Sequence, residues 1–111
     1  MQRLFVYGTL APGRPNHHVL AGIPGTWEPA VLRGTLHDEG WGAALGSPGI
    51  VPGPDGDEVE GFILTAESLE KHWPMLDEFE GDGYERVEVV VRVANDRELA
   101  AFVYALRLGG A

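Results

Sequence analysis

The sequence contains no cysteine. A disulfide framework, a thiol nucleophile and a cysteine-ligated metal site are therefore all excluded. The absence of cysteine is consistent with a cytoplasmic protein, which is the location we expect.

Positive charge is also scarce. Lysine and arginine together number 8 against 17 aspartates and glutamates, which gives a formal net charge of −9. A nucleic-acid-binding protein needs a basic surface to displace counterions. No apolar run approaches the ~18 residues of a membrane span, and the start MQRLFVYG is too short and too strand-like for a signal peptide. We therefore expect no nucleic-acid partner and no membrane association.

The chain has the length and the apolar content of one folded domain. Its 111 residues are 44% hydrophobic, enough for one hydrophobic core, and we expect a single domain over residues 1–111. One amphipathic pattern predicts a main helix at residues 66–80. Alternating or β-branched apolar runs predict strands at residues 3–7, 26–36, 58–64, 84–93 and 99–106.

Glycine and proline interrupt these elements. Residues 11–25 are predicted to connect two strands, with one helical turn at 16–20, and residues 46–57 are predicted to form a long loop. Pro29 and Gly34 indicate that the strand containing them lies at a sheet edge or is bulged.

Two further patterns complete the expected architecture. The pair Asn95-Asp96 predicts a hairpin between the last two strands, and residues 41–45 could continue the sheet. Many strands with one long helix predict an α+β fold, which we expect to be a small mixed β-barrel with one main helix and short flanking helical turns.

The predicted helix carries one acidic residue on its apolar face. With 100° per residue and Leu69 at 0°, Glu80 falls at about 20°, inside the apolar stripe, while Glu78 falls at about 180° and Asp77 at about 80°. The other members of that stripe are Leu69, Trp73, Leu76 and Phe79. Glu80 is therefore the acid of this group that is predicted to face the core.

Glu80 is also expected at the end of the helix, because Gly81 is a typical C′ residue. Apolar surroundings and the negative end of the helix dipole would both raise the pKa of its carboxyl group. A carboxyl group of this kind suits general acid/base chemistry near neutral pH. The alternative is that Glu80 frays into water from the last turn, since Pro74 disfavours helical geometry in the residue before it. The helical phase leaves both interpretations open.

Other site types find little support. Residues 77–88 fail the EF-hand template, because position six of that loop would be Asp82 rather than glycine. No histidine has metal-ligand spacing; these residues are His17, His18, His37 and His72. Ser47 and Ser68 lack the context of a serine hydrolase. We expect neither a metal nor an organic cofactor.

The stretch FVYGTL, residues 5–10, ends a predicted strand at Gly8. Glycine at a strand end forms turns, and it also lets a second molecule approach the backbone closely. A single glycine is no dinucleotide-binding fingerprint, which needs three at fixed spacing. The residues alone allow either the turn or the close approach.

Four segments in a fixed order give a further indication. They are FVYGTL at 5–10, VEGFIL at 59–64, LDEFEGDGYERVEV at 76–89 and FVYAL at 102–106. In this order the chain resembles the gamma-glutamylcyclotransferase-like family, which includes gamma-glutamylamine cyclotransferases, AIG2-like plant proteins and small bacterial relatives. The resemblance spans nearly the whole chain.

The resemblance implies a barrel with flanking helices and a cavity at the Tyr-Gly-Thr-Leu turn. It implies that backbone groups of this turn bind the glutamyl part of a substrate, and carried onto this chain they belong to Tyr7, Gly8, Thr9 and Leu10. It also implies that Glu80 is the general acid/base, the residue that the helical phase singles out independently. Ala11-Pro12-Gly13 stands where some relatives carry a basic pair, so the resemblance does not identify the substrate.

The expected activity is release of 5-oxoproline from a gamma-glutamyl amine or amino acid. The substrate's α-amine would attack its own γ-carbonyl, with Glu80 moving the proton. The alternative is a non-catalytic module that binds a small ligand in the same cavity. The sequence identifies neither the gamma-glutamyl compound that is bound nor the oligomeric state of the protein. Tyr84 and Tyr104 could line the cavity or pack in the core.

Overall fold

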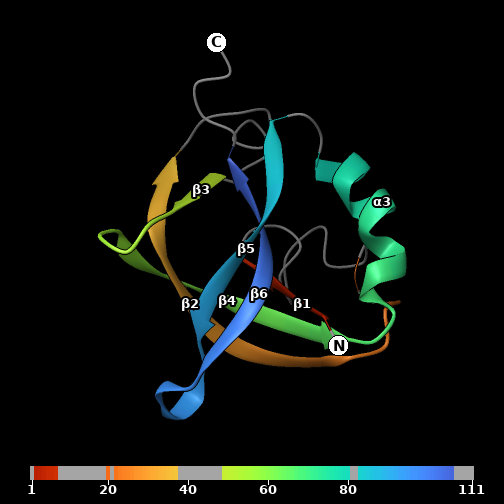
Figure 1. Ribbon diagram of the computed structural model, residues 1–111, viewed down its shortest axis with the longest axis horizontal. Coiled ribbons are helices and arrows are strands. Elements are labelled where there is room, and N and C mark those ends of the chain that lie inside the picture. Colours follow the sequence, from red (N-terminus) through yellow and green to blue (C-terminus); the bar gives the residue numbers. More distant parts are fainter. Residues whose placement is uncertain (1, 8–19, 21, 38–48, 81–82, 107–111) are drawn as a thin grey trace.

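The computed structural model describes residues 2–7, 20, 22–37, 49–80 and 83–106 (Figure 1). Within these residues the elements are β1 (Gln2–Val6), β2 (Thr26–His37), β3 (Gly49–Pro52), β4 (Asp57–Ala66), α3 (Leu69–Glu80), β5 (Tyr84–Arg92), the short 3-10 helix η1 (Ala94–Asp96) and β6 (Glu98–Leu106). The predicted extra strand at 41–45, and the predicted helical turn at 16–20 apart from Leu20, lie outside the described residues.

The strands form one mixed sheet that closes into a barrel. β4 lies between β1 and β2 and is antiparallel to both, while β5 and β6 form an antiparallel hairpin. The two halves meet where β1 runs parallel to β6 at Leu4 and Phe102, and where β2 meets β5 at Val31 and Arg92. β3 pairs along the second half of β2 and also touches β6. The α+β barrel predicted from the sequence is confirmed.

Side chains alternate between the two faces of each strand, so the barrel has a filled interior and a covered outer face. Every strand contributes to the interior, whose buried residues are Phe5, Ala30, Leu32, Ile50, Val59, Ile63, Val91, Val93, Ala101 and Val103. The outer core includes Leu4, Val6, Leu64, Ala66, Leu69, Trp73, Leu76, Tyr84, Tyr104 and Leu106. Helix α3 covers this outer face, and Figure 1 shows it beside the barrel.

The hairpin predicted at Asn95-Asp96 is confirmed. Both residues have positive φ, 62° and 57°, as the two central positions of a type I′ turn require. The Arg97 amide donates to the Ala94 carbonyl and closes the turn at 3.5 Å. This turn joins β5 to β6 in a register that places Arg86 directly opposite Tyr104.

Two predictions need correction. The loop predicted at 46–57 contains a strand, β3, because Ile50 fills the barrel interior and is fully buried. β2 is an edge only in its first half, over residues 26–30, where it pairs with β4 alone among the described strands. From Val31 onward β5 and then β3 also pair with it, while the pairing with β4 continues to Gly34. Pro29 lies in that first half, where a missing amide proton can face the open side of the strand.

Helix α3 begins at Leu69, three residues later than predicted, because β4 continues to Ala66. Ala66 is 1% exposed and packs in the outer core. No helix in the described ranges is long and apolar enough to cross a membrane.

Candidate functional site

The side chain of Tyr7 is partly buried and packs against the interior core of the barrel. Its ring stacks on Phe5, with centroids 6.1 Å apart. Its hydroxyl donates to the Tyr104 carbonyl at 3.0 Å and accepts from the Ile50 amide at 3.0 Å. The hydroxyl therefore bridges β6 and β3. Gly8, Thr9 and Leu10, the other three residues of the predicted binding turn, lie outside the described residues.

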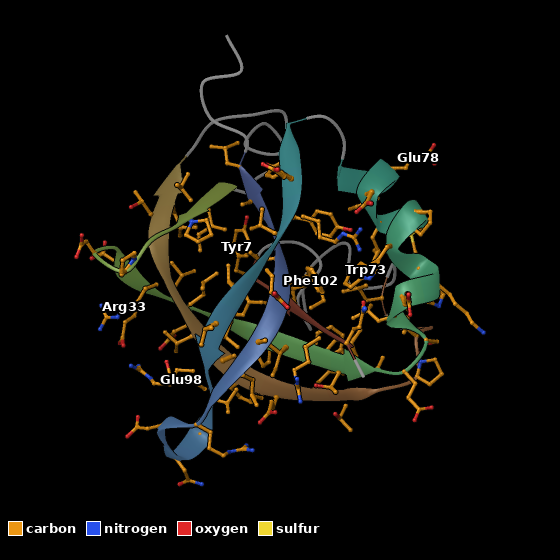
Figure 2. All side chains as sticks on the ribbon, viewed as in Figure 1. Tyr7, Arg33, Trp73, Glu78, Glu98 and Phe102 are labelled. Carbon is orange, nitrogen blue, oxygen red and sulfur yellow. The ribbon has the colours of Figure 1, made fainter. Side chains whose placement is uncertain are left out.

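The predicted apolar stripe of helix α3 is confirmed. Leu69 and Leu76 are fully buried, Trp73 is 6% exposed and Phe79 packs against the same core. Glu78 points away from the barrel, as Figure 2 shows. Glu80 is the last residue of the helix, and its side chain lies outside the described part of the chain.

Asp77 makes contacts that the sequence did not reveal. The Tyr104 hydroxyl donates to Asp77 Oδ1 at 2.6 Å, and Arg86 Nε lies 3.4 Å from the same oxygen. One indication of these contacts is present in the sequence: the helical wheel places Asp77 on the flank of the apolar stripe. Its partners could not be read from the sequence, because they lie on β5 and β6.

Arg86 lies between the helix and the hairpin. Its guanidinium carbon is 4.4 Å from the centroid of the Trp73 ring and 5.6 Å from that of Phe102, both within cation–π range. The Trp73 indole N–H donates to Gln2 Oε1 at 2.5 Å, which ties the same helix to β1. In Figure 2 Trp73 and Phe102 lie close together between the helix and the barrel.

Tyr104 connects the two segments singled out by the sequence. Its carbonyl accepts from Tyr7, at the end of β1, and its hydroxyl donates to Asp77, in the last turn of α3. Figure 1 shows the C-terminal end of α3, the start of β5 and the end of β6 at the same end of the barrel. Tyr104 therefore links Tyr7, the residue after β1, to the last turn of α3.

The other polar features lie elsewhere. Glu58 contacts both Arg33 and Arg92 on the outer face, and its hydrogen bond raises the pKa of Arg92. A groove of about 610 Å³ between β2, β4 and the end of β5 is lined by residues that include Glu28 and Phe62. Among the described residues, no three of histidine, aspartate and glutamate gather as a metal site would require.

A closed barrel with one helix on its outer face defines a small α+β fold. Residues 4–109 match the family described as gamma-glutamyl cyclotransferase, AIG2-like. The chain belongs to this family, and the resemblance inferred from the four segments is confirmed.

Solved structures agree with this assignment. The chain is similar to YkqA from Bacillus subtilis, with a TM-score of 0.71 and 31% identity over 96% of this chain and 36% of YkqA. It is similar to an AIG2-like protein from Mus musculus, with a TM-score of 0.69 and 27% identity over 95% of this chain and 76% of that protein. At3g28950.1 from Arabidopsis thaliana gives a TM-score of 0.67 and 26% identity over 95% of this chain and 61% of that protein.

The chain thus spans about a third of YkqA. No curated protein matches the sequence.

Proposed function

We propose that the protein is a gamma-glutamylcyclotransferase-type enzyme that releases 5-oxoproline from a gamma-glutamyl amine or amino acid. The observation that carries the proposal is the family match over residues 4–109, which includes both the Tyr-Gly-Thr-Leu turn and the helix end at Glu80. The link from Tyr7 through Tyr104 to Asp77 supports it, because it connects the first residue of that turn to the last turn of α3.

The proposed reaction is an intramolecular acyl transfer. The free α-amine of the substrate attacks its own γ-carbonyl, the five-membered lactam closes, and the nitrogen on the γ-side leaves. Glu80 accepts the proton that the α-ammonium loses and returns a proton to the leaving nitrogen, so the enzyme ends the cycle unchanged. Much of the acceleration comes from holding the amine in a near-attack position. These steps require neither a metal nor an organic cofactor.

Substrate binding is assigned to the backbone of Tyr7, Gly8, Thr9 and Leu10. The known contacts of Tyr7 favour this assignment, since its hydroxyl already bridges β3 and β6. Its side chain thus fixes the end of β1, and we propose that the amide and carbonyl groups of the turn that follows bind a glutamyl carboxylate and amine. Backbone amides of the same turn are also proposed to stabilise the oxyanion.

A product assay tests the proposal. The purified chain is incubated with γ-glutamyl amino acids, γ-glutamylamines and a γ-glutamyl isopeptide, and 5-oxoproline is quantified with the released amine. We expect catalytic release of both products in equal amounts from at least one compound class. Saturable binding without any release would instead establish the non-catalytic binding module, and the enzyme proposal would fail.

A further inference from the structure

The last turn of α3 lacks support within the helix itself. The final carbonyls of a helix have no intrahelical partner, and cations near them are stabilising while anions are not. No basic residue occurs in the last turn of α3, and three acids lie in its final four positions: Asp77, Glu78 and Glu80. Pro74 also removes one hydrogen bond from the middle of the helix. The position of this helix end must therefore depend on tertiary contacts.

Arg86 supplies the missing cation from a neighbouring strand. Its Nε lies 3.4 Å from Asp77 Oδ1, and its side chain is 27% exposed. The planar guanidinium lies over the Trp73 ring, 4.4 Å from its centroid, and 5.6 Å from the Phe102 centroid, a contact with aromatic faces that lysine does not reproduce. Arg86 is thus oriented before it meets the carboxylate.

Tyr104 makes the second contact with Asp77 and connects the end of the helix to the barrel. Its hydroxyl donates to Asp77 at 2.6 Å, a charge-assisted hydrogen bond of the stronger kind. Its carbonyl accepts from Tyr7, whose hydroxyl in turn accepts from the Ile50 amide. Tyr104 therefore joins two sets of contacts, one through its carbonyl to Tyr7 and β3 and one through its hydroxyl to the last turn of α3.

We propose that Asp77, held by Tyr104 and Arg86, is a positioning residue that fixes the last turn of α3, and with it Glu80, relative to the end of β1. Asp77 lies three residues before Glu80 in the same turn, so a shift of one moves the backbone of the other. The consequence for catalysis rests on the proposed function. The positioning role is independent of the proposed function, because it concerns only the mobility of the helix end.

The experiment combines amide hydrogen exchange with steady-state kinetics. Tyr104→Phe removes one hydroxyl and keeps the ring, and Asp77→Asn keeps an acceptor but removes the charge. Glu78→Gln, in the same turn but pointing into solvent, is the matched control. We expect amides of residues 77–80 to exchange about tenfold faster in Tyr104→Phe, while amides of β4 keep the parent rate. A charge-assisted hydrogen bond of about 1.5 kcal/mol corresponds to that factor.

The kinetic readout separates positioning from general stabilisation. Both variants should lose about tenfold in kcat while KM stays within twofold, and Glu78→Gln should match the parent. In the double variant Tyr104→Phe/Asp77→Asn, kcat should be at most twofold lower than in the less active single variant. The two changes act through one contact, so their effects should not add. Unchanged exchange at residues 77–80, a uniform rise across the molecule, or unchanged kcat with faster local exchange would each overturn the proposal.

Failure of the proposed function has a different signature. A parent chain that releases no 5-oxoproline refutes the cyclotransferase activity. The exchange measurement then decides by itself whether Asp77 and Tyr104 hold the helix end.

Discussion

Replacing Tyr7 by phenylalanine removes a single oxygen atom from the described site. That oxygen joins two hydrogen bonds, one to the Tyr104 carbonyl and one from the Ile50 amide, both 3.0 Å long. The ring and its stacking on Phe5 remain. The variant therefore measures how much the bridge between β3 and β6 contributes to stability.

The magnitude follows from burial. Ile50 is 0% exposed, so its amide cannot find water once the hydroxyl is gone. A net hydrogen bond contributes about 1 kcal/mol, and a buried polar group left without a partner costs about 1–3 kcal/mol. We expect Tyr7→Phe to lower the free energy of unfolding by about 2–3 kcal/mol. With about 4 °C per kcal/mol for a domain of this size, Tm should fall by about 10 °C.

Urea denaturation followed by tryptophan fluorescence measures this change, provided that unfolding is two-state. Thr35→Val, which removes an exposed hydroxyl from β2, is the control and should stay within about 0.5 kcal/mol of the parent. A Tyr7→Phe variant as stable as its parent would refute the reasoning. It would mean that the Ile50 amide and the Tyr104 carbonyl find other partners.

Three further predictions concern other positions. Gly61→Ala should lower the free energy of unfolding by about 1–3 kcal/mol in thermal denaturation, because the added Cβ would clash with the Val6 carbonyl oxygen and lie 2.7 Å from the Phe5 ring. An unchanged Tm would contradict the close packing of β1 on β4. Gly8→Val should weaken binding of a γ-glutamyl ligand at least tenfold per folded molecule by calorimetry, whereas a mere turn residue would lower only Tm. Glu80→Gln should be at least as stable as the parent at neutral pH, and the difference should shrink in mild acid. A raised pKa in the folded state costs stability above the unfolded pKa, and the cost levels off once the pH passes the folded pKa. A Gln variant that is clearly less stable at neutral pH in chemical denaturation would mean that the charge of Glu80 is paired and structural.

Local patterns predicted the features that depend on neighbours in the chain. The apolar stripe of Leu69, Trp73 and Leu76 follows from helical spacing, and all three residues are buried as expected. The hairpin at Asn95-Asp96 follows from the ease with which asparagine and aspartate adopt positive φ. In both cases the information lies within one element or one turn.

Features that depend on distant pairing could not be predicted in this way. β3 has four residues, with glycine at its start and proline at its end, a composition that is typical of a loop; only its pairing with β2 and the burial of Ile50 make it a strand. The contact of Asp77 with Arg86 and Tyr104 likewise requires the register of the hairpin and the position of α3 on it. No spacing along the chain encodes either arrangement.

The same distinction applies to the candidate site. Glu80 was identified by helical phase and by resemblance, and the backbone places it at the last position of α3. Its role, and those of Tyr7, Gly8, Thr9 and Leu10, remain predictions. The structure adds the contacts of Tyr7 and Asp77 with Tyr104, which connect the residue after β1 to the last turn of α3.

The most direct test of the account compares 5-oxoproline release by the parent chain, Glu80→Gln and Glu78→Gln at equal concentrations of folded protein. Glutamine keeps the shape of the side chain but cannot accept the proton from the α-ammonium. The account predicts that Glu80→Gln loses at least a hundredfold in kcat, while Glu78→Gln, exposed on the opposite side of the helix, retains the parent rate. Equal losses in the two variants, or full activity in Glu80→Gln, would contradict the assignment of Glu80 as the general acid/base.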